Sequence, residues 1–201
     1  MGPTKVDSDG VARAGSLETE DEGEIMVGYI ESAIPDKPLS EGVSVMVAIR
    51  LPQLIVKEAV IVDVGKIERP RLSLLLRNGR LVARLELDAV THWDLNGPTL
   101  QNVLQTIPSG NQIIVLQITK QPSKMQIWLN GDLGSELDIP QGLSGTLSGA
   151  CRLLASFEQD RPAADITVAG YSMGRPFDEA QVKALTRKSQ ELSNALGQRP
   201  G

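Results

Sequence analysis

Two carboxylates at alternate positions, Glu86 and Asp88, are the first side chains in this sequence whose spacing suggests chemistry. Retaining glycoside hydrolysis needs two carboxyl groups about 5 Å apart, one as the general acid and the other as the nucleophile. Alternate residues of a β-strand point to the same face and so meet that requirement. A structural interpretation competes with this one, because Glu86 is also placed to pair with Arg71 across a hairpin, and we favour the structural interpretation.

The sequence contains few residues that could support other catalytic chemistry or bind a metal ion. The chain has one histidine, His92, and one cysteine, Cys151, which cannot supply the four ligands of a His/Cys zinc site. We expect no catalytic triad around His92. Cys151 lies in an apolar stretch, which favours a buried, inert thiol over a nucleophile. We therefore predict that the protein is not an enzyme.

Sugar binding is the alternative chemistry, because sugar rings stack on indoles while their hydroxyl groups take directional hydrogen bonds. Aromatic residues make up only 3% of the chain, and Trp93 and Trp128 are its tryptophans. We identify Trp93 and Trp128, with Arg84 as a polar neighbour, as candidate ligand-binding residues. For Trp128 we favour the competing interpretation, in which the indole packs on the second face of a sheet.

Two Asn-Gly dipeptides between alternating apolar residues define the elements that would position these side chains. Both central residues of a type I′ turn need positive φ, which Asn and Gly accept best. We predict a hairpin from Arg71 to Asp88 around Asn78-Gly79 and a second turn at Asn130-Gly131. In the first hairpin, Leu72 would face Leu85 and Arg71 would face Glu86, so both faces specify the same register. We expect residues 91 to 110 to form a loop that carries His92 and Trp93.

Several stretches resemble concanavalin A-like lectin/glucanase domains of the laminin-G-like kind. They are the strand and turn QIWLNGDL (126 to 133), the early strand at Val43 to Leu51, the late strand at Ala164 to Tyr171 and the helix that begins at Phe177. The resemblance covers roughly residues 25 to 185. It implies an all-β fold, a two-sheet antiparallel jelly-roll sandwich. Gln112 and Ile113 depart from the family, which usually has a Trp-His pair there.

The resemblance also implies two further functions to weigh, glycosidase activity and calcium binding. Glucanases of this superfamily carry a Glu-x-Asp-x-x-Glu motif, and here Thr91 and His92 stand where the second Glu is required. A degenerate glycosidase is therefore only a remote alternative. Family members often hold calcium with loop carboxylates, for which Asp88, Asp94, Asp132 and Asp138 are candidates. These acids are scattered in the sequence, and we favour solvated turn residues, with no cofactor.

Composition divides the 201-residue chain into three parts. Residues 1–24 carry seven acidic and two basic side chains and are expected to form an acidic extended arm. Residues 25–175 form the sandwich, and residues 176–201 form a C-terminal helix and tail, with Asp178 as N-cap and Gln181 completing a capping box. The net charge of −5 argues against nucleic acid, and no apolar run approaches the roughly 18 residues of a membrane span.

These features favour a non-catalytic structural or interaction protein. The specific expectation is a surface (decoration) component of a viral capsid or tail, in a virion or another particle assembled in the cytoplasm, since no signal peptide is recognised. Its partners would be proteins of that assembly, bound through residues 1–24 and the C-terminal helix. The alternative is a carbohydrate-binding, lectin-like adhesin module that binds a glycan.

Overall fold

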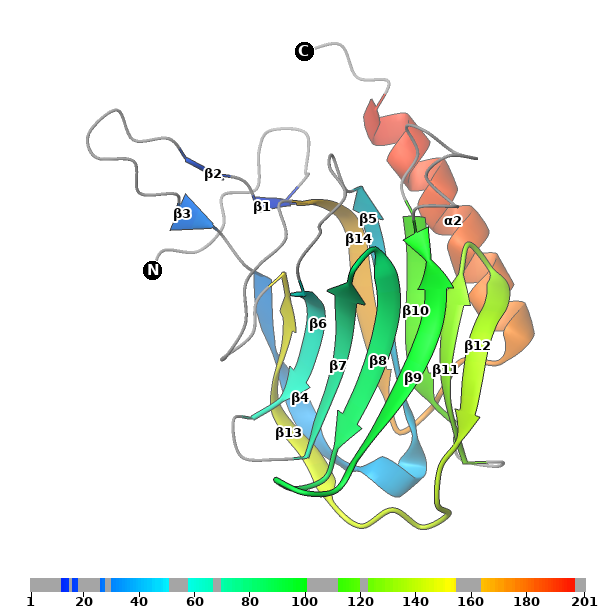
Figure 1. Ribbon diagram of the computed structural model, residues 1–201. Coiled ribbons are helices and arrows are strands. Elements are labelled where there is room, and N and C mark those ends of the chain that lie inside the picture. The colour runs from blue at the N-terminus through cyan, green and yellow to red at the C-terminus, as the bar shows by residue number, and fades with distance from the viewer. Residues whose placement is uncertain are drawn as a thin grey trace.

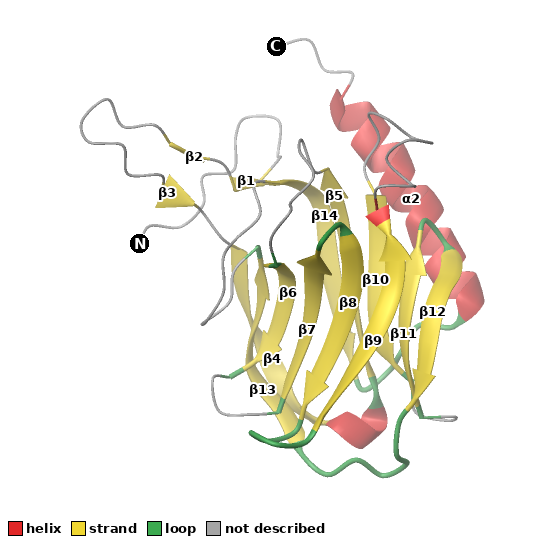
Figure 2. Ribbon diagram, viewed as in Figure 1, coloured by secondary structure: helices red, strands yellow, loops and turns green. Residues whose placement is uncertain are grey.

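The fold is a sandwich of two six-stranded antiparallel sheets (Figure 1). The computed structural model describes residues 12–14, 16–17, 26–27, 30–50, 58–66, 70–100, 112–119, 123–154 and 164–197. Strands and one C-terminal α-helix account for most of these residues (Figure 2). The predicted all-β, two-sheet sandwich is therefore confirmed.

The first sheet, here called the β5 sheet, combines strands from both ends of the chain. Its order is β1 (Ala12–Ala14), β14 (Ala164–Met173), β5 (Val43–Arg50), β10 (Gln112–Ile118), β11 (Lys124–Leu129) and β12 (Asp132–Asp138). The last strand of the chain thus pairs with the early strand β5, with Arg50 opposite Asp165.

The second sheet, here called the β7 sheet, is built mainly from the middle of the chain. Its order is β4 (Ile30–Pro38), β13 (Thr146–Leu153), β6 (Ala59–Gly65), β7 (Arg71–Arg77), β8 (Arg80–Glu86) and β9 (His92–Thr99). A 3-10 turn, η1 (Leu39–Glu41), follows β4, and β2 (Ser16–Leu17) pairs with β3 (Met26–Val27) in a separate ribbon.

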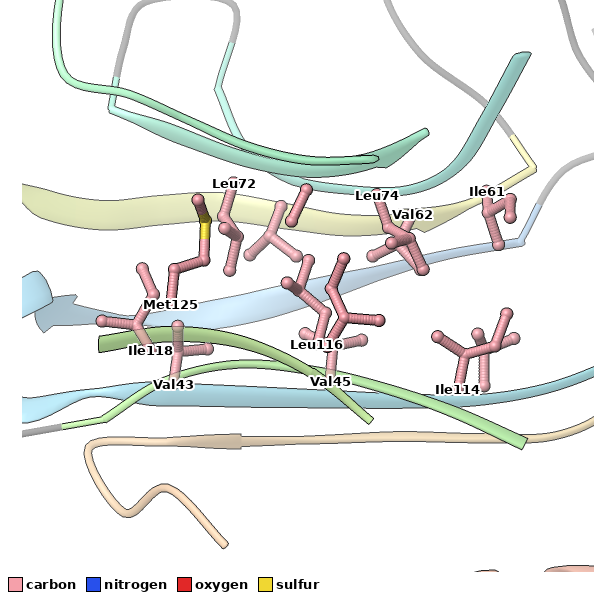
Figure 3. Close-up of a cluster of buried hydrophobic side chains, with 14 of the residues drawn as sticks. Val43, Val45, Ile61, Val62, Leu72, Leu74, Ile114, Leu116, Ile118 and Met125 are labelled. Carbon is pink, nitrogen blue, oxygen red and sulfur yellow. The ribbon is translucent and has the colours of Figure 1, made fainter. Parts of the chain in front are cut away.

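The core lies between the sheets and follows the period-two pattern of the strands. Val43 and Val45 of β5 and Leu116 of β10 point toward Leu72 and Leu74 of β7 (Figure 3). All five side chains are at most 2% exposed. Alternation therefore places one apolar row of each strand in the shared interior.

Both Asn-Gly turns have the predicted conformation. The φ angles are 50° and 74° at Asn78 and Gly79, and 55° and 92° at Asn130 and Gly131. Between β7 and β8, Leu72 pairs with Leu85 and Arg71 with Glu86, as predicted. The hairpin register is set by complementary side chains on both faces.

The prediction of a loop from residue 91 to residue 110 is wrong in its first part, because His92–Thr99 forms β9. Asn96, Gly97 and Pro98 are turn-forming residues, but β9 is an edge strand that pairs only with β8 in its own sheet. An edge strand tolerates such residues because one side of it has no ladder hydrogen bonds to lose.

The edges of the two sheets meet where β9 contacts β12. A Cβ placed on Gly134 of β12 would lie 2.5 Å from Cγ of Pro98, and one placed on Gly97 would lie 2.7 Å from Cδ1 of Ile127. Only glycine permits this approach, so the sandwich is closed along this side.

Helix α2 (Glu179–Gly197) covers the outer face of the β5 sheet (Figure 1). Its start has the predicted capping box: Asp178 N–H donates to Gln181 Oε1 at 2.9 Å, and Gln181 N–H donates to Asp178 Oδ1 at 2.8 Å. Phe177 and Val182 pack in the same apolar cluster beneath the helix. These contacts fix both the first turn of α2 and its docking on the sheet.

Candidate binding face

A set of polar side chains gathers on the outer face of β8 and β9, away from the core. We call this set the β8–β9 face. Period two brings alternate residues of each strand to it, and antiparallel pairing aligns Arg84 with Asp94 and Glu86 with His92. His92 and Asn96 are exposed, and the other three side chains are half-buried. The β8–β9 face consists of Arg84, Glu86, His92, Asp94 and Asn96.

The β8–β9 face is the solvent-accessible end of a row of polar side chains that crosses five strands, here called the polar row. Register alignment places Arg152 of β13 beside Asp63 of β6, Asp63 beside Ser73 of β7, Ser73 beside Arg84, and Arg84 beside Asp94. Arg152 at the other end is half-buried, with 12% side-chain exposure. From Asp63 outward, exposure rises from 0% at Asp63 and 4% at Ser73 to side-chain values of 25% at Arg84 and 29% at Asp94. The row is therefore buried at β6 and β7 and accessible at β8 and β9.

The buried part of the row is an ion pair with added hydrogen bonds. Arg71 Nη2 and Nε donate to the two carboxylate oxygens of Asp63 at 3.0 and 3.3 Å. Ser73 Oγ donates to Asp63 Oδ1 at 3.3 Å. A buried charge is tolerated only when it is paired and hydrogen-bonded in this way, so these residues anchor the row.

At the accessible part, Arg84 and Asp94 form a two-point ion pair. Nε and Nη2 of Arg84 each donate to a different oxygen of Asp94, both at 2.7 Å. The hydrogen bond from Arg84 is the main cause that lowers the pKa of Asp94, and it likewise raises the pKa of Arg84. Both groups therefore stay charged and are held in one geometry before any ligand arrives.

The two carboxylates of the glycosidase interpretation lie in different environments. Glu86 is the last residue of β8 and stands opposite Arg71 and His92. Asp88 lies beyond the strand, where its Oδ1 accepts the backbone N–H groups of Val90 and Thr91, each at 2.8 Å. Asp88 thus organises the β8–β9 connection and does not share a strand face with Glu86.

The sequence also contains a serine motif, Gly170-Tyr171-Ser172-Met173-Gly174, which has Gly-x-Ser-x-Gly spacing. In a nucleophile elbow the serine sits on a strained turn between a strand and a helix. Ser172 instead lies within β14 opposite Ser44, and its Oγ donates to the carbonyl of Arg175 at 2.8 Å. His92 belongs to the other sheet, so the structure does not bring these two residues together.

Cys151 has the environment expected of an inert thiol. It is 5% exposed and packs within the main core cluster. Burial is the largest cause that raises the pKa of its thiol to about 12. Since the thiolate is the reactive form, Cys151 is unreactive at neutral pH.

The structure separates the three candidate ligand-binding residues. Trp128 is 7% exposed beneath α2, and its Nε1 donates to Gln126 Oε1 at 3.3 Å. Trp93 is half-buried and packs against the main core. Only Arg84 lies on the β8–β9 face, because Trp93 alternates with His92 and Asp94 and so points inward. The alternation of His92, Asp94 and Asn96 with apolar neighbours was the sequence signal for this face.

The four calcium candidates are also dispersed. Asp94 is paired with Arg84, and Asp88 accepts backbone hydrogen bonds. Asp132 and Asp138 are at opposite ends of β12, with Asp138 Oδ1 3.8 Å from Lys124 Nζ. Within the described ranges, no three His, Cys, Asp or Glu residues form a group suited to a metal ion.

Comparison with solved structures supports the fold. No family model and no curated protein matches the chain. The binding domain of botulinum neurotoxin DC in complex with rat synaptotagmin II matches with a TM-score of 0.72 and 16% identity, over 94% of this chain and 46% of that one. The same domain in complex with SialylT matches with a TM-score of 0.71 and 14% identity, over 94% and 45%.

A third similar structure concerns botulinum neurotoxin type C, whose cell entry is dependent upon interaction with two ganglioside molecules. It matches with a TM-score of 0.70 and 16% identity, over 94% of this chain and 45% of that one. The chain therefore spans less than half the length of these neighbours. At such identities the likeness establishes a shared β-sandwich fold.

In the part of the chain that the structure describes, no helix combines the length and apolar character needed to cross a membrane.

Proposed function

We propose that this protein is a non-catalytic, lectin-like binding module that binds a glycan on the β8–β9 face. The observation that carries the proposal is the Arg84–Asp94 pair, held by two hydrogen bonds of 2.7 Å between the exposed His92 and Asn96. Together these side chains offer donors and acceptors at fixed positions on a rigid strand pair.

A hydroxyl-rich ligand suits this face better than an apolar or a strongly charged one. Sugar hydroxyl groups both donate and accept, and Asn and carboxylate groups can match them in pairs. The charges of Arg84 and Asp94 already neutralise each other, which leaves Glu86 as the one other carboxylate of the β8–β9 face. Because the pair is ordered in advance, the protein loses less conformational entropy when a ligand binds.

The solved neighbours are consistent with a binding role. One is a binding domain in complex with rat synaptotagmin II, and another comes from a neurotoxin that interacts with gangliosides. Extending this role to the present chain is part of the proposal, as is its finer placement among concanavalin A-like, laminin-G-like domains. The scattered carboxylates support a site without calcium, so calcium is a variable in the test.

A glycan array with the intact chain, with and without calcium, tests the proposal. We expect a defined set of glycans to bind, and His92→Ala and Asn96→Ala each to weaken binding about fivefold, the value of one hydrogen bond of about 1 kcal/mol. Arg187→Ala, on the exposed side of α2, is the matched control and should bind normally. An array without hits would overturn the proposal, as would unchanged binding by both variants.

The second candidate function is docking into an assembly such as a viral capsid or tail, in a virion or another particle built in the cytoplasm. Two observations favour it. Ala12–Ala14 of the acidic N-terminal region pairs with β14 at the edge of the β5 sheet, and Leu192 on α2 is 45% exposed. Both chain ends thus present surfaces beside the sandwich.

Deletion of residues 1–24 tests this second function. If the acidic arm is the tether, the truncated protein keeps the folded sandwich and loses incorporation into its particle. Added salt should also weaken docking of the full chain, because a basic partner surface is screened over about 8 Å at physiological ionic strength. Normal incorporation of the truncated chain would move the docking site to Leu192 and the C-terminal helix.

A further inference from the structure

The two Asn-Gly turns share a sequence and a backbone conformation, yet their asparagine side chains are held differently. Asn-Gly is also the dipeptide in which the asparagine side chain is most open to attack by the following backbone nitrogen, because glycine has no Cβ to hinder approach. The two turns therefore form an internal comparison within one chain.

Asn130 is restrained on three sides. Its backbone N–H donates to the carbonyl of Ile113 at 2.8 Å, its Oδ1 accepts the N–H of Ile113 at 2.9 Å, and its Nδ2 donates to Gln112 Oε1 at 2.8 Å. Helix α2 covers this turn, since a Cβ on Gly131 would lie 3.6 Å from Thr186. The amide of Asn130 is thus fixed as the cap of strand β10.

Asn78 is exposed, and among the described residues its side chain has no hydrogen-bond partner. One restraint acts on the next residue, because the carbonyl of Gly79 accepts the N–H of Leu100 at 2.7 Å. The rotation that brings the Gly79 nitrogen to the Asn78 side chain must therefore overcome this contact and the Arg77–Arg80 pair that flanks the turn, but no side-chain contact of Asn78 among the described residues. At Asn130 it must break the side-chain contacts as well.

We propose that Asn78 is a site of spontaneous deamidation in the folded protein and that Asn130 is protected from it. The deprotonated backbone nitrogen of Gly79 attacks Cγ of Asn78, the new N–C bond closes a succinimide ring, and the side-chain nitrogen leaves as ammonia. Water then opens the ring at one of its two carbonyl groups. The product is aspartate or isoaspartate, with one added negative charge.

The new carboxylate changes the chemistry of the β7–β8 turn. Arg77 and Arg80 stand opposite each other beside Asn78, and Arg77 is also paired with Glu58. Aspartate at position 78 keeps a turn-compatible Asp-Gly pair and adds a second carboxylate that attracts the two arginines. Isoaspartate adds a carbon to the backbone and disturbs the pairing of Leu76 with Leu81. The two products therefore move hairpin stability in opposite directions.

Peptide mapping by mass spectrometry of the full chain, aged in mildly alkaline buffer, tests the proposal. Chain unfolded in urea serves as the reference in which both dipeptides are free. In the folded protein we expect Asn78 to react at least about tenfold faster than Asn130, a barrier difference of about 1.4 kcal/mol. In urea the two rates should converge. The Asn78→Asp variant provides the standard for the aspartate product.

A variant of Gln112 checks the cause of protection. Gln112→Leu removes the acceptor of Asn130 Nδ2 and should raise the reaction at Asn130 while leaving the rate at Asn78 unchanged. Reaction at Asn130 as fast as at Asn78 in the folded wild-type protein overturns the proposal. An intact Asn78 in the folded chain, after both sites have reacted in urea, overturns it as well.

Discussion

The outer faces of the two sheets solve the same problem in opposite ways. The β5 sheet turns outward Met46, Ala48, Ile113, Val115 and Trp128, and α2 buries them. The β7 sheet turns outward the polar row from Arg152 to Asp94 and, beside it, a buried apolar cluster of Val60, Leu75 and Val82. Helix α2 covers the apolar residues of the β5 sheet, whereas an ion pair satisfies the polar row of the β7 sheet where it reaches solvent.

This difference separates stability from binding. The helix-covered face resembles an ordinary core, so its residues serve packing. On the β7 sheet the polar row is buried at Asp63, where its charge must be paired within the protein, and accessible at Asp94, where the proposed ligand would bind. Substitutions on the two faces should therefore change the free energy of unfolding by different amounts. The expected change decreases from Asp63 through Asp178 and Asp94 to Thr186.

Asp63→Ala should have the largest effect. It removes the carboxylate that Arg71 contacts at 3.0 and 3.3 Å in a site where both side chains are at most 5% exposed. Loss of one partner of such a pair costs about 3–5 kcal/mol of unfolding free energy. Urea denaturation measures the loss. Asp138→Ala, at a carboxylate with 86% side-chain exposure, should change stability by less than about 0.5 kcal/mol.

Asp178→Ala should have an intermediate effect on the other face. It removes one half of the capping box, and loss of an N-cap costs about 1 kcal/mol. Urea denaturation should show this loss, and hydrogen exchange should increase first in α2. The control is Gln190→Ala, which changes an exposed position of the same helix. Equal protection of α2 in the two variants would contradict the role of Asp178.

Asp94→Asn should have a smaller effect that depends on pH. The pKa of Asp94 is lowered in the folded state, so its ion pair stabilises the protein above the ordinary pKa of an aspartate and loses that contribution as pH falls through the lowered pKa. The stability difference between wild type and Asp94→Asn should therefore be present at neutral pH and shrink in acid. Parallel urea titrations across this range measure it. A difference that grows in acid would contradict the assignment.

Thr186→Val should have the smallest effect, and it should stabilise the protein. The Oγ1 of Thr186 is buried beneath α2 and, among the described residues, has no hydrogen-bond partner. Valine has the same shape without that polar atom, so a gain of up to about 1 kcal/mol in unfolding free energy is expected. Thermal unfolding followed by tryptophan fluorescence, from Trp93 and Trp128 together, detects the change. A loss of stability would show that the hydroxyl group has a partner.

Local rules were sufficient for the elements that the sequence predicted correctly. The β7–β8 register follows from apolar and charged pairs within one hairpin, and the start of α2 follows from Asp178 and Gln181. Each involves residues near one another in the chain, where turn chemistry and alternation act directly.

Strand pairing without a clear turn signal decided what the sequence did not predict. Asp63 and Arg71 are eight residues apart, but no Asn-Gly dipeptide lies between β6 and β7, and the place of Arg152 in the row depends on β13 lying beside β6. Polar and apolar residues alternate from His92 to Leu95, but the turn-forming residues that follow them in β9 favoured the prediction of a loop over that of an edge strand. The sequence favoured packing of the Trp128 indole on the second face of its sheet. The fold shows that α2 covers this face.

The position of the last two strands has a consequence for synthesis of the protein. β13 inserts between β4 and β6, and β14 joins β5 to β1, so each sheet contains a late strand next to early ones. During translation, the β7 sheet cannot be completed until Leu153 has left the ribosome, and the β5 sheet cannot be completed until Met173 has left it. Early strands such as Val43–Arg50 must wait with unpaired edges, which slows folding and exposes apolar surface to other nascent chains. The same topology that joins early and late strands into one sandwich therefore delays the burial of apolar surface in the growing chain.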